Sequence, residues 1–330
     1  MINLTFDQIK SELKRILIKS GFDDGKADSL AGIFASNNLL GKESHGLNRF
    51  PAFIESVKKG YVKTSSKPER VSSFNAFEQW DGKLGAGPLN AMFCTERAMR
   101  LSDKYGIGCV SLRNTNHWMR GGAYGWKAAE EGYILICWTN AIPTMPAWGS
   151  FRAGLGNNPL VIGVPNGATP VVLDMALSQY SYGALEIKKQ KSEMLDYFGG
   201  YNNQGKLTKE PSEILESRRA LPAGLWKGSG LSLVFDMIAS VMSGGQTVSR
   251  IGKQEAEYGV SQIYIAMNPE AAGTKGAAAN IIDEIINDFH SYAGGDDLYF
   301  PGERSSSFKT RNEKNGINVD GSLWKKITGM

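Results

Sequence analysis

The sequence contains three histidines, and two of them lie in short polar segments that could carry out acid–base chemistry. His45 sits in Ser44-His45-Gly46, and Arg49 follows four residues later. Histidine titrates near neutral pH, arginine can hold a carboxylate through two hydrogen bonds, and residues four apart share a helix face. The pattern suits reduction of an oxo-acid, in which Arg49 holds the carboxylate and His45 donates a proton to the carbonyl oxygen. A helix-capping Ser-His pair with a surface arginine is the alternative.

The second histidine, His117, follows an expected strand and precedes the glycine pair Gly121-Gly122. Polar loops at the carboxyl end of a strand often carry ligand contacts in α/β proteins. The glycine pair opens an expected helix, whose first N–H groups could face a phosphate. A hydrogen-bonded turn without a ligand is an equally good interpretation. The third histidine, His290, falls within an expected helix, where a structural role is favoured.

Two later segments add a carboxylate and a cation to these candidates. Asp174 ends an apolar segment, where a carboxylate is costly unless it has a partner. It could orient a histidine or only cap the next segment. Trp226 and Lys227 precede the most apolar expected helix, and an aromatic ring with a cation at a helix N-terminus suits a dinucleotide. The basic turn at residues 301–304 (Pro-Gly-Glu-Arg) is a further candidate contact.

The motifs of the common nucleotide-binding folds do not occur in this sequence. The Gly-x-Gly segments that start at Gly85, Gly154 and Gly228 each lack glycine at the sixth position, so none completes G-x-G-x-x-G. There is no P-loop, no G-x-S-x-G and no H-E-x-x-H motif. The histidines and the three cysteines lack ligand spacing, so we expect no metal site.

The composition narrows the class of protein. A formal charge of +4, from 37 basic and 33 acidic residues spread evenly, argues against nucleic-acid binding. With 42% hydrophobic and 21% charged residues, the chain should fold. An odd number of cysteines fits a reducing compartment, and the N-terminus lacks an apolar signal segment. Prolines interrupt the uncharged stretches at 132–151 and 153–173, so we expect a cytoplasmic protein without membrane spans.

The elements that position these residues follow from hydrophobic spacing. Three helices are expected in the opening section, between Thr5 and Gly21 and at residues 24–38 and 48–59. Residues 189–220 are polar and charged, which indicates a long exposed excursion. The tail from residue 302 is expected to hold only a short helix at 323–327. The strands are expected at 107–112, 133–138, 160–164, 170–173 and 262–267, and further helices at 89–105, 122–130, 231–242 and 277–292.

Together these segments resemble the type-2 malate/L-lactate dehydrogenase family. They occur in family order, and the resemblance extends across essentially the whole chain. It implies an NAD(P)H-dependent reductase of small 2-oxo acids, and a homodimer with active sites near the subunit interface. The pieces that carry it are Ser44-His45-Gly46 with Arg49, Asn116-His117, Asn158-Pro159, Leu173-Asp174-Met175-Ala176, Lys227-Gly228 and Pro301-Gly302-Glu303.

The resemblance also implies a role for individual residues. His45 would donate the proton, with Ser44 and Asp174 as its partners, and Arg49 would bind the substrate carboxylate. NADH is the expected cofactor, with NADPH as the alternative. The expected cofactor contacts are His117, Trp118, Met119, Arg120, Gly121, Pro170, Val171, Val172, Leu173, Asp174, Met175, Ala176, Trp226, Lys227, Gly302, Glu303 and Arg304.

One position departs from the family pattern. The family usually has threonine before Asn-Pro, at a position that touches substrate, whereas this chain has Asn157. An amide there adds a second donor and some bulk, so the substrate can differ within the family. Malate, lactate or ureidoglycolate specificity, and reduction of a cyclic imino acid, stay open as alternatives. A non-catalytic ligand-binding protein on the same fold is the alternative from a different class.

These observations lead to one expected architecture. The fold is expected to be α/β, with a mixed sheet in a non-Rossmann NAD(P)-binding domain and a smaller helical N-terminal unit. The helical unit is placed at residues 1–70, joined by the C-terminal tail 305–330. The cofactor-binding α/β domain is placed at residues 71–304.

Overall fold

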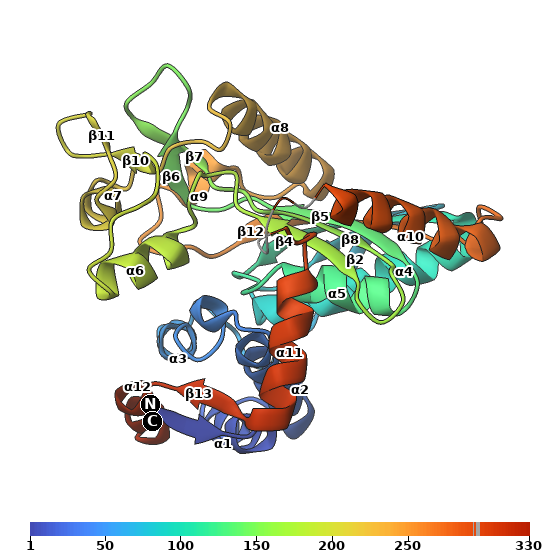
Figure 1. Cartoon of the computed structure of the whole chain (residues 1–330), viewed down its shortest axis with the longest axis horizontal. Helices are drawn as coiled ribbons and strands as arrows, with labels where there is room; N and C mark the ends of the chain where they lie inside the picture. The colour runs from blue at the N-terminus through green and yellow to red at the C-terminus, as the bar shows by residue number, and fades with distance from the viewer. Residues whose placement is uncertain (293, 295–297) are drawn as a thin grey trace.

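The computed structural model describes residues 1–292, 294 and 298–330. A seven-stranded sheet forms its centre (Figure 1). Its strands, in spatial order, are β2 (Glu69–Phe74), β3 (Phe77–Asp81), β4 (Ile107–Thr115), β12 (Val260–Met267), β5 (Ile134–Thr139), β8 (Leu160–Val164) and β9 (Val171–Met175). The β3–β4 pair is parallel, and the other neighbouring pairs are antiparallel. The expected mixed α/β fold is confirmed, and the sheet is not the parallel doubly wound sheet of a Rossmann domain.

Helices cover both faces of this sheet because its strands are apolar on both sides. Alternate residues of one strand point to opposite faces, so Tyr264 of β12 packs in the cluster under α4 (Gly87–Tyr105) and α5 (Gly122–Glu130). Its neighbour Ile263 packs with Trp138 against α8 (Trp226–Ser243) on the other face. Figure 1 shows α8 on one side of the sheet and α5 on the other. Among the described residues, no helix combines the length and apolar composition of a membrane span.

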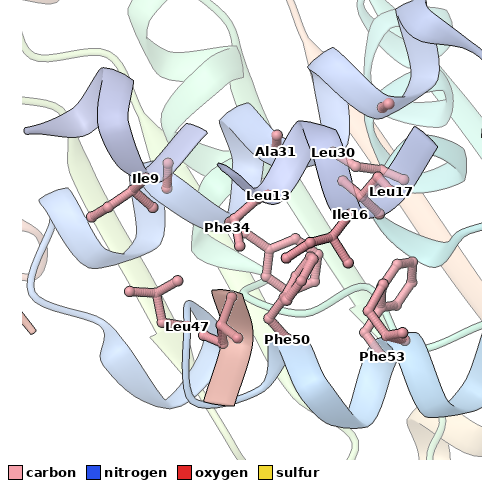
Figure 2. Packing of buried hydrophobic residues seen from close by; sticks show 14 of the residues in the cluster. Ile9, Leu13, Ile16, Leu17, Leu30, Ala31, Phe34, Leu47, Phe50 and Phe53 are labelled. Carbon is pink, nitrogen blue, oxygen red and sulfur yellow. The ribbon is translucent and has the colours of Figure 1, made fainter. Parts of the chain in front are cut away.

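The N-terminal helices pack around a separate hydrophobic cluster (Figure 2). Thr5 caps the first helix through a capping box with Gln8, as its position before an apolar repeat predicts. The strand at the N-terminus pairs with one near the C-terminus, which supports the proposed helical unit; its boundary at residue 70 stays a prediction. The elements are β1 (Ile2–Leu4), α1 (Phe6–Lys19), α2 (Asp24–Leu39), the 3₁₀ turn Glu43–His45, α3 (Phe50–Lys58), β13 (Ile317–Val319) and α12 (Gly321–Thr328).

The helix α11 (Glu303–Asn315) joins the sheet to the helical unit (Figure 1). At its start, the carbonyl of Pro301 accepts a hydrogen bond from the N–H of Val172 in β9. At its end, the side-chain amide of Asn312 donates to the carbonyl of Leu39 in α2. Sequence analysis expected no helix here, because the segment is polar and lacks an apolar repeat.

The expectation that residues 189–220 form a long exposed excursion is only partly right, because many of these residues are exposed but the segment has a small core of its own. Leu195, Ile214 and Ala220 are buried together with Leu185 of the preceding helix. A few widely spaced apolar residues are enough for this small core, and their spacing has no local period that sequence analysis could use. The elements of this region are α6 (Tyr182–Gln190), β10 (Gly200–Tyr201), β11 (Leu207–Thr208) and α7 (Pro211–Ser217).

The remaining expected helices and strands are found close to their predicted bounds. The strand at 160–164 and the helix at 122–130 have the expected ends. The edge strand β2 and its neighbour β3 were not predicted, because both are largely polar. The other elements are β6 (Pro143–Pro146), β7 (Ala153–Gly156), α9 (Val248–Ile251) and α10 (Lys275–Ser291).

Candidate active site

A cavity of about 680 Å³ lies between the helical unit and one edge of the sheet. Its wall includes residues 117–121 after β4, residues 139–141 after β5, and Glu257 and Val260 at the start of β12. Because β12 is antiparallel to both β4 and β5, its start lies beside their ends. Residues 41–45, after α2, close the opposite side. The volume is in the range typical of small-molecule sites.

His45 lines this cavity from a short turn that two asparagines hold in place. The side-chain amide of Asn37 donates to the carbonyl of His45, and Asn38 accepts a hydrogen bond from the N–H of Leu47. A Cβ at Gly46 would lie 1.9 Å from Asn38 Oδ1, so this position requires glycine. Sequence analysis did not identify these asparagines, because two polar residues at the end of a helix are common.

The ring of His45 has two close neighbours. The hydroxyl of Ser44 is 3.1 Å from Nδ1, which leaves Nε2 to face a ligand. The ring of His117 stacks on it, with centroids 6.0 Å apart and an interplanar angle of 13°. Burial lowers the pKa of His45, and the charge of Asp174 partly opposes that shift. The protonated ring is therefore a stronger acid than a histidine in water.

The second histidine, His117, is held neutral. Its Nδ1 accepts a hydrogen bond of 3.0 Å from the N–H of Met119, so the proton of the neutral ring is on Nε2. Burial lowers the pKa of His117 well below its usual range, and the charges of Arg49 and His45 act in the same direction. At neutral pH the side chain is therefore a hydrogen-bond donor through Nε2.

Arg120 and Asp174 form a charged part of the cavity wall, in contrast to the neutral His117. Arg120 is 4% exposed, and its Nε and Nη1 have no hydrogen-bond partner among the described residues. Its Nε lies 3.8 Å from Asp174 Oδ2, which also accepts a 2.8 Å hydrogen bond from the N–H of Gly122. The first amide of α5, a candidate for phosphate, is thus already bound to a carboxylate. The N–H of Gly122 and the guanidinium of Arg120 are thus the partners that a carboxylate at the end of an apolar strand requires.

Lys42 adds a second cation, and sequence analysis did not identify it. The residue lines the cavity three positions before His45. Burial lowers its pKa, the charge of Arg120 acts in the same direction, and Asp174 opposes both. Lys42 and Arg120 with Asp174 form what we call the cationic end of the cavity. His45 with His117 form its reacting end.

Glu257 is the second residue that sequence analysis missed. Its Oε2 accepts a hydrogen bond of 2.8 Å from the N–H of Ile142. Burial raises the pKa of this carboxyl group, and the charges of Arg49 and Arg218 oppose the shift. Only the pairing of β12 with β5 brings residue 257 to the cavity, so the local sequence held no signal for it.

The structure brings together many but not all of the expected site residues. Those that line the cavity are Ser44, His45, His117, Trp118, Met119, Arg120, Gly121, Asn157, Val172, Leu173, Asp174, Ala176 and Gly302. In the described part of the chain, the wall does not include Arg49, Pro170, Val171, Met175, Trp226, Lys227, Glu303 or Arg304.

Three of the residues outside the wall have identifiable surroundings. Arg49 is exposed at the start of α3, yet its charge acts on both histidines. Trp226 is 65% exposed at the start of α8. The carboxylate of Glu303 accepts from the N–H of Phe300, and its Oε2 lies 3.3 Å from Nε2 of His290. In the described structure none of these three side chains lines the cavity, although Arg49 is close enough for its charge to act on both histidines.

Comparisons with known proteins agree with this architecture. Residues 4–328 match the model of the family described as malate/L-lactate dehydrogenase. The chain is 42% identical to 2,3-diketo-L-gulonate reductase of Escherichia coli O127:H6 (strain E2348/69 / EPEC), over 100% of both chains. It is similar to malate dehydrogenase from Entamoeba histolytica, with a TM-score of 0.91 and 26% identity over 99% of this chain and 96% of that one. It is also similar to sulfolactate dehydrogenase from Methanocaldococcus jannaschii, with a TM-score of 0.89 and 26% identity over 99% of this chain and 95% of that one.

Proposed function

Because the chain belongs to the malate/L-lactate dehydrogenase family and is an oxidoreductase of 2-hydroxy or 2-oxo acids, we propose that it reduces 2,3-diketo-L-gulonate to 3-dehydro-L-gulonate. One observation carries the reaction type: a single cavity joins a stacked histidine pair to guanidinium donors of Arg120 that have no hydrogen bond among the described residues. The full-length identity to a reductase of that name supports the substrate.

The proton required by this reaction comes from His45. A bound nicotinamide supplies the hydride that adds to the carbonyl carbon. In the protonated ring, Nδ1–H donates to the hydroxyl of Ser44, and Nε2–H is free to protonate the carbonyl oxygen. The charge of Asp174 favours the protonated ring without a hydrogen bond to it in the described structure. Asp174 is thus an electrostatic partner of His45.

Two further residues position the substrate in this proposal. His117, neutral and protonated on Nε2, donates a hydrogen bond to a substrate oxygen beside His45. Arg49 binds the substrate carboxylate, which its charge at the histidine pair supports. Asn157 lines the cavity and offers both a donor and an acceptor.

The cationic end fits the diphosphate of a nicotinamide dinucleotide. Two guanidinium nitrogens of Arg120 are buried without a partner, a costly arrangement that an anionic ligand relieves. Lys42 lies at the same end, and Gly302 with Ser305 line the wall at the start of α11. We assign NADH as the cofactor. Direct titration with NADH and NADPH distinguishes the two, because only NADPH carries a 2′-phosphate.

Asn157 favours a second candidate substrate class within the same chemistry. The residue lies in the cavity wall, at a position where the family usually has threonine. An exchange of hydroxyl for amide there changes hydrogen bonding to the substrate. Malate, lactate or ureidoglycolate chemistry, or reduction of a cyclic imino acid, is therefore the alternative.

A substrate panel tests the proposal. Consumption of NADH is followed with 2,3-diketo-L-gulonate, oxaloacetate, pyruvate and a cyclic imino acid, each repeated with NADPH. We expect kcat/KM for 2,3-diketo-L-gulonate to exceed the others by at least about tenfold. Preferred turnover of another substrate would overturn the substrate assignment and leave the reaction type in place.

We further propose that the enzyme is a homodimer through α8. The inner side of this helix is buried on the sheet, yet its outer side exposes large apolar residues: Leu233, Val234, Met237, Ile238, Val241 and Met242. A helix that is apolar all round is normally covered, and a second copy of the same face suits it. Gly228 of α8 packs against the carbonyl of Leu177, next to the cavity residue Ala176, so the active sites would lie near the interface. Sedimentation analysis should show a dimer, and Val241→Glu a monomer.

A cytoplasmic location is the last part of the proposal. Cys94, Cys109 and Cys137 are all unpaired. Burial raises the pKa of each thiol, to about 11 for Cys109. Unpaired thiols that stay reduced are typical of a reducing compartment. Fractionation of cells that express the protein tests this location.

A further inference from the structure

Glu257 is a carboxylate in the cavity wall that the proposed mechanism does not use. Its Oε2 is held by the N–H of Ile142 at 2.8 Å. Its Oε1 has no hydrogen bond to any described residue, although the residue lines the same cavity as His45 and Asn157. One oxygen is therefore anchored and the other is available to a ligand.

The charges around Glu257 are arranged in a way that selects among 2-oxo acids. Arg49 and Glu257 act on each other electrostatically, but no ion pair within 4.0 Å joins them in the described part of the chain. The same holds for Arg218, which also acts on Glu257. In the described part of the chain, this cation and this carboxylate have no ion-pair partner, so each can take a complementary group of the substrate.

We propose that Glu257 is a specificity residue that accepts hydrogen bonds from hydroxyl groups on the substrate tail and repels a second carboxylate. This inference rests on the proposed function for the position of the 2-oxo acid group. His45, Asn157 and Glu257 line the same cavity, so a substrate with its carbonyl at His45 can place its tail against the open Oε1 of Glu257. A polyhydroxylated tail offers donors to the open Oε1.

The same carboxylate disfavours dicarboxylic substrates. The N–H of Ile142 and the charges of Arg49 and Arg218 favour the ionised form of Glu257 against the effect of burial. The second carboxylate of oxaloacetate would then meet a like charge in a half-buried site, which is strongly unfavourable. Pyruvate has no tail and meets neither the attraction nor the repulsion. Glu257 therefore sets the order of preference among 2-oxo acids: a substrate with a hydroxylated tail is preferred to one with no tail, and one with an acidic tail is disfavoured most.

The test compares Glu257→Gln with the wild type. Glutamine has the same shape, and its carbonyl oxygen can still accept from Ile142, but the charge is lost. Calorimetry on the protein saturated with NAD⁺ measures the dissociation constants of oxaloacetate and pyruvate without turnover. We expect oxaloacetate binding to tighten at least about tenfold relative to pyruvate, because removal of a like charge is worth more than one power of ten. For 2,3-diketo-L-gulonate, KM should rise while kcat changes little.

Two control variants keep the test decisive. Glu257→Asp retains the charge and should retain the discrimination against oxaloacetate. Glu255→Gln removes a carboxylate that accepts from Tyr61 outside the cavity wall, and should change neither ratio. The inference is overturned if Glu257→Gln leaves the ratio of the oxaloacetate and pyruvate dissociation constants within twofold of the wild-type ratio. Absence of turnover of 2,3-diketo-L-gulonate by the wild type would instead overturn the proposed function, and the calorimetric ratio would still report on Glu257.

Discussion

The two ends of the cavity differ in whether their polar side chains already have hydrogen-bond partners. At the reacting end, both histidines are held by partners: Ser44 at Nδ1 of His45 and the N–H of Met119 at Nδ1 of His117. At the cationic end, two nitrogens of Arg120 are buried with no partner in the described structure. A group that transfers a proton must be oriented before the substrate arrives. A group that binds an anion must keep its donors open until then.

This difference has an energetic consequence. Hydrogen bonds at the reacting end stabilise the ligand-free fold, whereas the unpaired guanidinium of Arg120 destabilises it. The nearby carboxylate of Asp174 offsets only part of that cost, because its 3.8 Å separation from Nε is too long for a hydrogen bond. Binding and stability should therefore respond differently to substitutions at the two ends.

The largest expected effect comes from the reacting end. His45→Ala should lower kcat by about 10²- to 10⁴-fold, because the general acid is lost. The dissociation constant for NADH should change little, since the nitrogens left open to the diphosphate belong to Arg120 and not to His45. Stopped-flow turnover and NADH fluorescence titration measure the two quantities. A variant that keeps kcat within about tenfold of the wild type would contradict the role of His45.

Substitution at the cationic end should have the opposite signature. Arg120→Met removes two or more charge-assisted hydrogen bonds to the cofactor, so the dissociation constant for NADH should rise about 10- to 100-fold. The melting temperature of the ligand-free protein should change little, because the buried guanidinium lacks hydrogen bonds at Nε and Nη1 and Asp174 keeps the N–H of Gly122 as a partner. Arg120→Lys is the matched control, as it keeps the charge without the planar fork. Loss of stability together with unchanged NADH affinity would show a structural role instead.

The smallest effect connects the two ends electrostatically. The positive charge of Lys42 lowers the pKa of His45 and the negative charge of Asp174 raises it. In Lys42→Met, the pKa of His45 should therefore move up, and in Asp174→Asn it should move down. Reduction needs protonated His45, so activity is lost as the pH rises past the pKa of this residue. Compared with the wild type, this loss should occur at higher pH in Lys42→Met and at lower pH in Asp174→Asn.

NMR titration of the histidine ring protons in the ligand-free protein measures these shifts directly. The chain has only three histidines, so the resonance of His45 is assigned with His45→Ala. Shifts in the same direction for both variants would contradict the proposed electrostatic link between the ends.

Much of the fold and part of the site followed from local sequence. The capping box at Thr5 and the apolar repeat after it predicted α1, because those contacts form within one helix turn and one face. The motif around His45 predicted the acid–base centre, since histidine, serine and arginine carry their chemistry in their side chains. Segments 122–130 and 160–164 were predicted to the residue.

Other parts of the site depend on contacts between distant segments, which local spacing does not encode. The first amide of α5 is bound by Asp174, a residue 52 positions later in the chain. Glu257 reaches the cavity only because β12 pairs with β5. The small core under residues 189–220 likewise forms from apolar residues too far apart to show a period.

The sequence by itself thus determined most of the helices, five of the seven strands of the central sheet and the family, and it pointed to His45 as the candidate acid. The tertiary structure decided which polar atoms of charged side chains lack a hydrogen bond among the described residues, at Nε and Nη1 of Arg120 and Oε1 of Glu257. The physical reason is that helix and strand preferences act over a few neighbouring residues, whereas the burial and pairing of a charge depend on every segment packed around it.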